Sequence, residues 1–138
     1  MRNTGASIAC LRRRQAYPHT VPSRSRSAVY ARRRKRRMAR VEHDLTDAQW
    51  TALNQAWDGC AYCGAQQADL QKDCMLPISR GGRYTLDNVV PACRSCNASK
   101  CNFEVTSWLR RKKLDEQAFL VRQVQIRRAV ENAADPTA

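Results

Sequence analysis

Two pairs of closely spaced cysteines constrain the fold of this chain more than any other feature of its sequence. Two residues separate Cys60 from Cys63, and Cys93 and Cys96 repeat that spacing. This spacing lets one tight turn direct both sulfur atoms at a single ion, and two such turns supply the four thiolates of a tetrahedral zinc site. One pair alone is compatible with a redox centre, but two pairs flanking one short segment favour a metal. We therefore expect a structural Zn²⁺, closed by four sulfur ligands and without a catalytic role.

The positive charge of the chain is concentrated at its N-terminus. The 138 residues include 25 Lys and Arg against 12 Asp and Glu, a formal net charge of +13. Residues 1–40 hold 13 of the basic residues and no acidic residue, so the rest of the chain is balanced. An excess of Lys and Arg indicates a polyanionic partner, because these side chains displace the counterions condensed on nucleic acid.

The composition divides the chain into three segments. Residues 1–40 are rich in Arg and Ser and poor in large apolar residues, so we expect a disordered arm there. This segment is a basic arm along the phosphate backbone, an organellar transit peptide, or the product of an over-extended start. The third alternative is slightly favoured, with Met38 as the true start. Residues 41–131 are expected to form one zinc-binding domain, and residues 132–138 a disordered tail.

The sequence also limits where the protein works. It has no run of apolar residues that suits a secretory signal or a membrane span. Seven cysteines, an odd number, fit a reducing compartment better than a set of disulfides. We expect a cytoplasmic protein without a membrane partner, and nothing in the sequence indicates its oligomeric state.

The first helix has a clear start and end. Thr46 and Gln49 have the spacing of a capping box, and Gly59 is a typical helix terminator. Leu45 lies just before the cap, where it can contact the helix as a hydrophobic staple. An apolar stripe at helical spacing follows, formed by Trp50, Leu53 and Trp57. We expect both tryptophans to pack in the core.

The remaining elements are short. Residues 69–76 and 86–91 are expected to be strands separated by a loop. A helix is predicted from Ser95, whose hydroxyl can cap it, and another over residues 105–113. Asp115 is expected to cap a last helix.

The segment between and after the cysteine pairs carries a second pattern. Its elements are Asp73-Cys74, then Pro77-Ile78-Ser79-Arg80-Gly81-Gly82, then Asn88, and finally Cys93-Arg94-Ser95-Cys96-Asn97-Ala98-Ser99-Lys100. This combination resembles the HNH endonucleases in their zinc-containing, four-cysteine form, over about residues 58–110. The resemblance implies a small α+β fold, the ββα-metal hairpin-helix core, stapled by the zinc site and flanked by helices. It also implies metal-dependent hydrolysis of DNA phosphodiester bonds.

The resemblance assigns roles to individual residues. Asp73 and Asn97 match the two ligands of the catalytic divalent ion, for which oxygen donors suit Mg²⁺ or Mn²⁺. Asn88 matches the middle Asn, which supports the hairpin loop and orients the general base. Cys74 stands where the family has the His that activates water, and here the chain departs from the pattern.

This departure bears on catalysis. A neutral imidazole is a good base near pH 7, whereas a free thiol with a reference pKa of about 8.5 is mostly protonated there. Loss of a general base lowers the rate by roughly 10²- to 10⁴-fold. The chain's two histidines, His19 and His43, lie outside the motif and are not expected to substitute.

A second departure is Cys101, where the family usually has Gly. If the helix starts near Ser95, Asn97 and Cys101 share one helical face, so Cys101 could lie beside Cys74 and Asp73. The two thiols then form a Zn²⁺-accepting site, a redox-sensitive pair, or simply two unrelated buried cysteines, and we favour the last. Cys10 receives no interpretation.

Positively charged side chains in and after the motif are candidates for DNA contact. Such residues position the phosphate backbone without reading its sequence. For the cluster at residues 110–113, a solvated helix end is an equally weighted alternative. The candidates are Arg80, Arg83, Arg94, Lys100, Arg110, Arg111, Lys112 and Lys113.

Three functions are compatible with these observations. The first is an HNH endonuclease that cleaves DNA with a divalent ion, despite Cys74. The second is a DNA-binding pseudo-nuclease that has kept the zinc fold and lost the base. The third, a zinc-ribbon interaction module, leaves Asp73, Asn88 and Asn97 without a purpose. The first is favoured.

Overall fold

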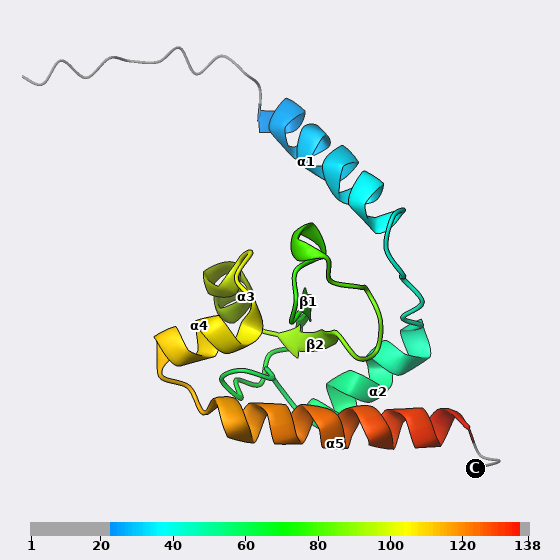
Figure 1. Cartoon of the computed structure of the whole chain (residues 1–138), viewed down its shortest axis with the longest axis vertical. Coiled ribbons are helices and arrows are strands. Elements are labelled where there is room, and N and C mark those ends of the chain that lie inside the picture. The colour runs from blue at the N-terminus through cyan, green and yellow to red at the C-terminus, as the bar shows by residue number, and fades with distance from the viewer. Residues whose placement is uncertain (1–22, 136–138) are drawn as a thin grey trace, which may run out of the picture.

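The computed structural model describes the backbone of residues 23–135 and the side chains of residues 26–135 (Figure 1). Cys10 and His19 lie outside these residues. In chain order the elements are α1 Ser23–Met38, α2 Asp47–Trp57, β1 Gln71–Cys74, the 3-10 turn η1 Ile78–Arg80, β2 Val89–Ala92, α3 Arg94–Lys100, α4 Val105–Lys112 and α5 Glu116–Ala134. None of the described helices combines the length and apolar character needed to cross a membrane.

A two-stranded hairpin followed by a helix forms the centre of the fold. β1 pairs with β2 in antiparallel register, with Gln71 opposite Ala92 and Cys74 opposite Val89. α3 begins two residues after β2 and contacts β1. This arrangement confirms the small α+β fold and the hairpin-helix order expected from the resemblance.

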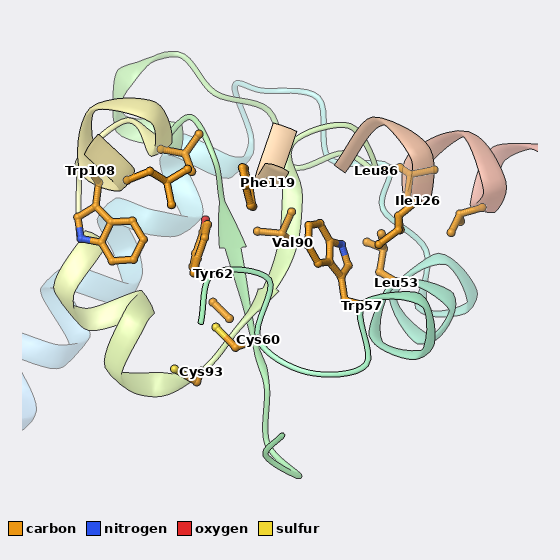
Figure 2. Close-up of a cluster of buried hydrophobic side chains, with 14 residues drawn as sticks. Leu53, Trp57, Cys60, Tyr62, Leu86, Val90, Cys93, Trp108, Phe119 and Ile126 are labelled. Carbon is orange, nitrogen blue, oxygen red and sulfur yellow. The ribbon is translucent and has the colours of Figure 1, made fainter. Parts of the chain in front are cut away.

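The core joins this hairpin to α2 and α5, which lie side by side (Figure 1). Trp57 stacks on Phe119 with ring centroids 5.7 Å apart, and Tyr62 meets Trp108 edge-on at 5.0 Å. Figure 2 shows the Tyr62 ring between Phe119 and Trp108, above Cys60 and Cys93. Trp57 is buried as predicted, and Trp50 packs against the same core from its edge. The core therefore includes Cys60 and Cys93, and Cys96 packs against it.

The helix signals read from the sequence are present in the structure. Thr46 accepts a hydrogen bond from the amide of Gln49, whose side chain accepts one from the amide of Thr46. This reciprocal pair is the predicted capping box. Asp115 accepts a hydrogen bond from the amide of Ala118 and so caps α5.

The cap of α3 differs from the prediction. Cys93, not Ser95, is the N-cap residue: its backbone is extended, and its sulfur accepts a hydrogen bond from the Cys96 amide at 3.4 Å. Ser95 lies within the first turn. A Ser hydroxyl caps helices more often than a Cys sulfur does, so Ser95 was the expected cap. The turn that brings Cys93 and Cys96 together places the N-cap two residues before Ser95.

Within the described residues, two segments that were expected to be disordered are helical. Residues 23–38 form α1, and α5 continues through Ala134, beyond the boundary expected at residue 131. Disorder was expected at residues 1–40 only because they cannot form a packed core. Arg, Lys, Ala and Met are nevertheless good helix formers without a core, because their side chains lose little freedom in a helix.

Candidate functional site

The four cysteines of the two pairs come together in space. Their sulfur atoms all lie within 4.8 Å of one another, with Cys63 and Cys93 3.7 Å apart. Against the effect of burial, hydrogen bonds from the Cys96 amide and the neighbouring thiols lower the pKa of Cys93, whereas burial and the neighbouring thiols raise the pKa of Cys63 and Cys96. The thiolate is the form of cysteine that binds a metal. The four cysteines are thus placed to hold a metal ion.

The turn after the first pair explains how both of its sulfurs reach this point. Gly64 has φ +74° and donates its amide to the Cys60 carbonyl at 2.8 Å, while the Cys60 amide donates to the Ala65 carbonyl at 3.0 Å. Such a reversal suits glycine, which carries no Cβ to oppose a positive φ. On the other side, the Ala61 amide donates to the Pro91 carbonyl at 2.8 Å and ties this turn to β2.

A pocket of about 430 Å³ opens beside β1 and α3. Three of the residues to which the resemblance gave catalytic roles line it: Asp73, Cys74 and Asn97. We call it the site pocket. Asp73 and Cys74 come from the end of β1, and Asn97 comes from the first turns of α3. The hairpin-helix order therefore gathers residues that are 24 positions apart in the sequence.

Asn88 supports the loop that leads to this pocket. Its side-chain oxygen accepts the Leu76 amide at 2.9 Å, and its side-chain nitrogen donates to the Leu76 carbonyl at 2.9 Å and the Arg83 carbonyl at 2.6 Å. Gly82 lies in the same loop, where a Cβ would come within 1.8 Å of the Leu76 oxygen. The loop geometry thus requires both an Asn and a Gly. That Asn88 orients a general base stays a prediction.

Asp73 is buried, with 6% of its surface exposed, and it has two partners that the sequence did not reveal. The Tyr62 hydroxyl donates to its Oδ2 at 2.6 Å, and Lys100 Nζ lies 3.1 Å from the same oxygen and 3.3 Å from Oδ1. Burial raises the pKa of Asp73, and the Lys100 charge and the Tyr62 hydroxyl lower it by less. The carboxylate is therefore held by an internal cation.

Lys100 corrects one expectation. Its side chain is fully buried, and its ammonium also donates to the Cys74 carbonyl at 2.7 Å. It does not face solvent and so is not a DNA contact. The burial of Tyr62 and Lys100 depends on how α3 crosses the hairpin. The only sequence signal was position: Tyr62 lies inside a cysteine pair, and Lys100 lies one helical turn after Asn97.

Comparison with known proteins identifies the family of this segment. Residues 60–113 match the model of a family described as HNH endonuclease. This segment is similar to HNH endonucleases. The chain is also 30% identical over 89 residues to an SPbeta prophage-derived putative HNH endonuclease of Bacillus subtilis. That alignment covers 54% of this chain and 37% of the relative, so the chain spans little more than a third of the relative's length. No solved structure gives a significant match.

Within the HNH segment, Cys74 does not have the properties of a base. Burial, followed by the charge of Asp73, raises the pKa of its thiol to about 11. The one histidine among the described residues, His43, does not line the site pocket, and its Nδ1 lies 2.9 Å from the Val41 carbonyl. The described part of the site pocket therefore contains no imidazole.

Cys101 lines the same pocket as Cys74, and both are free thiols. Cys101 ends α3 with φ +48° and ψ −121°, a conformation that favours glycine. This explains why the HNH family usually has Gly at this point. Among the described residues, the only group of three or more His, Cys, Asp or Glu side chains placed to share an ion is the four-cysteine cluster. A second, softer metal site or a redox pair at Cys74 and Cys101 stays a hypothesis.

The arginines predicted to contact DNA differ in how they are placed. Arg94 is exposed and lines the site pocket. Arg80, exposed in η1, donates to the Asn102 carbonyl at 3.4 Å beside the pocket. Arg83 forms ion pairs with Glu42 and Asp87 at 3.1 and 3.0 Å. Arg94 is thus the candidate with the most direct access to the HNH site.

The cluster at residues 110–113 is partly neutralised. Arg110 forms a two-point ion pair with Glu116, and the guanidinium of Arg111 lies 3.8 Å from the ring centre of Phe103. Lys112 and Lys113 are exposed. Its residues do not line the site pocket. A role in DNA contact stays a prediction.

One side of the pocket comes from outside the HNH segment. Tyr30, Arg34 and Arg37 of α1 line it, opposite the HNH segment. Residues 1–40 were interpreted as a disordered arm, so no position in them was matched to the site. The spacing of these three residues, i, i+4 and i+7, was the available signal, since it places them on one face of a helix.

Proposed function

We propose that this protein is an HNH-type endonuclease that hydrolyses DNA phosphodiester bonds with a divalent ion, on a fold closed by a structural Zn²⁺. One observation carries the proposal: Asp73, Cys74 and Asn97 line one pocket, and Arg94 lies at that pocket. Phosphodiester hydrolysis requires oxygen ligands for a metal, a positioned water and cations for the phosphate. The pocket offers the first and the third of these.

The donor chemistry fits Mg²⁺ or Mn²⁺. Asp73 supplies a carboxylate and Asn97 a carboxamide, and oxygen donors of this kind suit hard divalent ions. The Asn97 side-chain nitrogen donates to Gln71 at 2.7 Å, so the opposite end of the amide, its oxygen, is the available ligand. A bound divalent ion would neutralise charge on the phosphate and the leaving oxygen. Lys100, in contact with the same carboxylate, weakens the attraction for this ion by its own charge.

The four-cysteine cluster fits Zn²⁺ for a different reason. Thiolates are soft ligands, and four of them in tetrahedral order form a closed structural site with no position for substrate. This supports a role in folding. The cluster would hold β2 and the start of α3 against the turn at Cys60.

A second candidate function has an observation of its own. A thiol with a pKa of about 11 is protonated at neutral pH and accepts no proton from water. This favours a pseudo-nuclease that binds DNA and hydrolyses it slowly or not at all. Cys74 is the residue that separates the two candidates.

A plasmid-nicking assay with added Mg²⁺ or Mn²⁺ tests both. We compare the wild type with Cys74→His, Asp73→Asn and Asn97→Ala, and use Asp69→Ala, at an exposed position, as the matched control. Asp73→Asn keeps the shape of the side chain, and Asn97→Ala changes a partly exposed residue, so a folding defect in one leaves the other informative. Circular dichroism and zinc content confirm the fold of each variant.

For the endonuclease, the wild type and Asp69→Ala nick equally, and Asp73→Asn and Asn97→Ala do not. Cys74→His is then expected to nick roughly 10²-fold faster or more, because it restores the general base. If Cys74→His alone nicks, the natural protein is the pseudo-nuclease. If none of the proteins nicks DNA, the site assignment is wrong.

A further inference from the structure

Helix α1 lies beside the site pocket although it belongs to neither the HNH segment nor the core. It contacts the turn η1, which follows β1. Three of its side chains, Tyr30, Arg34 and Arg37, line the pocket.

The charge of α1 has no internal partner among the described side chains. Eight of its sixteen residues are Arg or Lys, and none is Asp or Glu. The five ion pairs found within residues 26–135 all lie outside α1. Like charges three and four residues apart on a helix repel one another, so α1 is destabilised by its own charge unless an anion binds it. This repulsion is a reason to expect an anionic ligand on α1, and it does not depend on the pocket.

A cation also lies on the facing wall of the pocket. Arg94, from the first turn of α3, lines the pocket that Arg34 and Arg37 line from α1, whereas the Lys72 ammonium lies 5.4 Å from the centre of the Trp50 ring. The one carboxylate among the lining residues, Asp73, is already paired with Lys100. An anion in this space would therefore meet positive charge from two sides and no free negative charge.

The form of α1 distinguishes a nucleic acid from a membrane surface. A helix that lies on a membrane needs a continuous apolar face, and the large apolar side chains described on α1 are Val29, Tyr30 and Met38. Its length, about 24 Å for sixteen residues at 1.5 Å each, corresponds to about seven nucleotides at 3.4 Å per step. A row of cations of this length suits a polyanion with a regular repeat.

We propose that α1 is one side of a clamp that holds the phosphate backbone of DNA across the site pocket, with Arg34 and Arg37 as its contacts. The HNH segment, through Arg94, forms the other side. The choice of DNA and the position of a phosphate at the pocket rest on the proposed function. Binding itself does not require cleavage, so the two proposals can fail separately.

The two faces of α1 provide a matched comparison. Arg34→Ala/Arg37→Ala removes two cations from the face that lines the pocket, and Arg32→Ala/Lys35→Ala removes two from the opposite face. Both double variants lose the same charge, all four residues are exposed, and Ala is the best helix former, so α1 is preserved in each. Affinity of the full-length chain for a labelled 20-base-pair DNA is measured by fluorescence anisotropy at several salt concentrations, without added divalent ion.

We expect Arg34→Ala/Arg37→Ala to weaken binding roughly tenfold and to reduce the salt slope by about 2, since each lost phosphate contact contributes about 0.9. The control variant, Arg32→Ala/Lys35→Ala, should change the affinity and the salt slope by less than half as much. Equal losses in the two variants would mean that α1 acts only as an unoriented polycation. No loss in either would mean that α1 does not touch DNA. Both results overturn the clamp.

The same proteins separate this proposal from the proposed function. Nicking by the wild type with Mg²⁺ or Mn²⁺ is measured beside its binding, which needs no divalent ion. Binding that depends on Arg34 and Arg37 without any nicking supports the clamp and removes the endonuclease. If the wild type nicks DNA but its binding does not depend on Arg34 and Arg37, the endonuclease is supported and the clamp is overturned.

Discussion

Asp73 shows how one residue can serve both the fold and the site. It ends β1 next to Cys74, faces the pocket, and is held from within by Tyr62 and Lys100. Removing one partner of a buried ion pair leaves the other charge uncompensated, which typically destabilises a protein by about 3–5 kcal/mol. The pair with Lys100 therefore makes Asp73 sensitive to any substitution that removes its polar oxygens, apart from any role with a metal.

The thiol of Cys74 provides a prediction about pH. Since burial and Asp73 raise its pKa to about 11, the reactive thiolate should increase about tenfold for each pH unit between 7 and 10. Iodoacetamide labelling without added Mg²⁺ or Mn²⁺, followed by peptide mass mapping, measures this rate at Cys74 alone. A labelling rate that levels off near pH 8 would show that the thiol has an ordinary pKa and would reopen its role as a base.

Nicking should follow the same direction if Cys74 is the base. The wild-type rate would then rise with pH through the alkaline range, whereas Cys74→His should reach a plateau above about pH 7, the range in which imidazole is neutral.

Helix α3 carries most of the site at the scale of single elements. Its N-cap is the metal-ligand candidate Cys93, its middle presents Asn97 to the pocket, and its last residue, Lys100, turns inward. Three separate tasks therefore fall on eight residues, the N-cap Cys93 and the seven residues of α3. The helix ends at Cys101, whose positive φ is a conformation that side chains other than Gly adopt at a cost of about 1–3 kcal/mol.

Replacing Cys101 by Gly should therefore stabilise the protein. We expect the free energy of unfolding to rise by about 1 kcal/mol in Cys101→Gly, because Gly adopts this conformation without strain. Cys101→Ala is the matched control: it also removes the thiol but keeps the Cβ, so no gain is expected. Urea denaturation at fixed zinc concentration measures the difference. An equal gain in both variants would assign the effect to the thiol instead of the backbone.

The stability of the whole molecule depends on the cysteine cluster, because the hydrophobic core is small and includes two of the four cysteines. Cys60 and Cys93 belong to the same buried group as Trp57 and Trp108, and α5 and α2 close that group from the other side (Figures 1 and 2). Metal binding in small domains of this kind contributes about 10–16 kcal/mol to folding at neutral pH. The proposed Zn²⁺ is thus expected to decide whether the domain folds.

Removal of the metal should unfold the domain. A strong chelator, or Cys93→Ser, is expected to abolish the near-ultraviolet circular dichroism of the buried tryptophans and the cooperative thermal transition. Cys74→Ser, which alters a free cysteine outside the cluster, should retain one zinc per chain and the transition. Zinc is measured by elemental analysis of freshly reduced protein. A chelated protein with an unchanged transition would show that the cluster is not a structural centre.

Much of the fold could be predicted because its signals are local. The capping box at Thr46, the cap at Asp115 and the two short strands depend on residues within a few positions of one another. The cap of α3 was expected two positions late, at Ser95 instead of Cys93, because a cysteine thiol is not a common cap. The order of α1 was missed because the absence of a core was taken to mean the absence of structure.

The sequence by itself determined that two cysteine pairs form a metal site, since spacing and residue type are sufficient for that expectation, and that the segment between and after them resembles the HNH endonucleases. Only the tertiary structure decided that Lys100 is buried against Asp73, and that Arg34 and Arg37 face the pocket. Both facts depend on how distant elements cross, α3 over β1 and α1 over η1. Such crossings are fixed by packing between segments far apart in the chain, which no local pattern encodes.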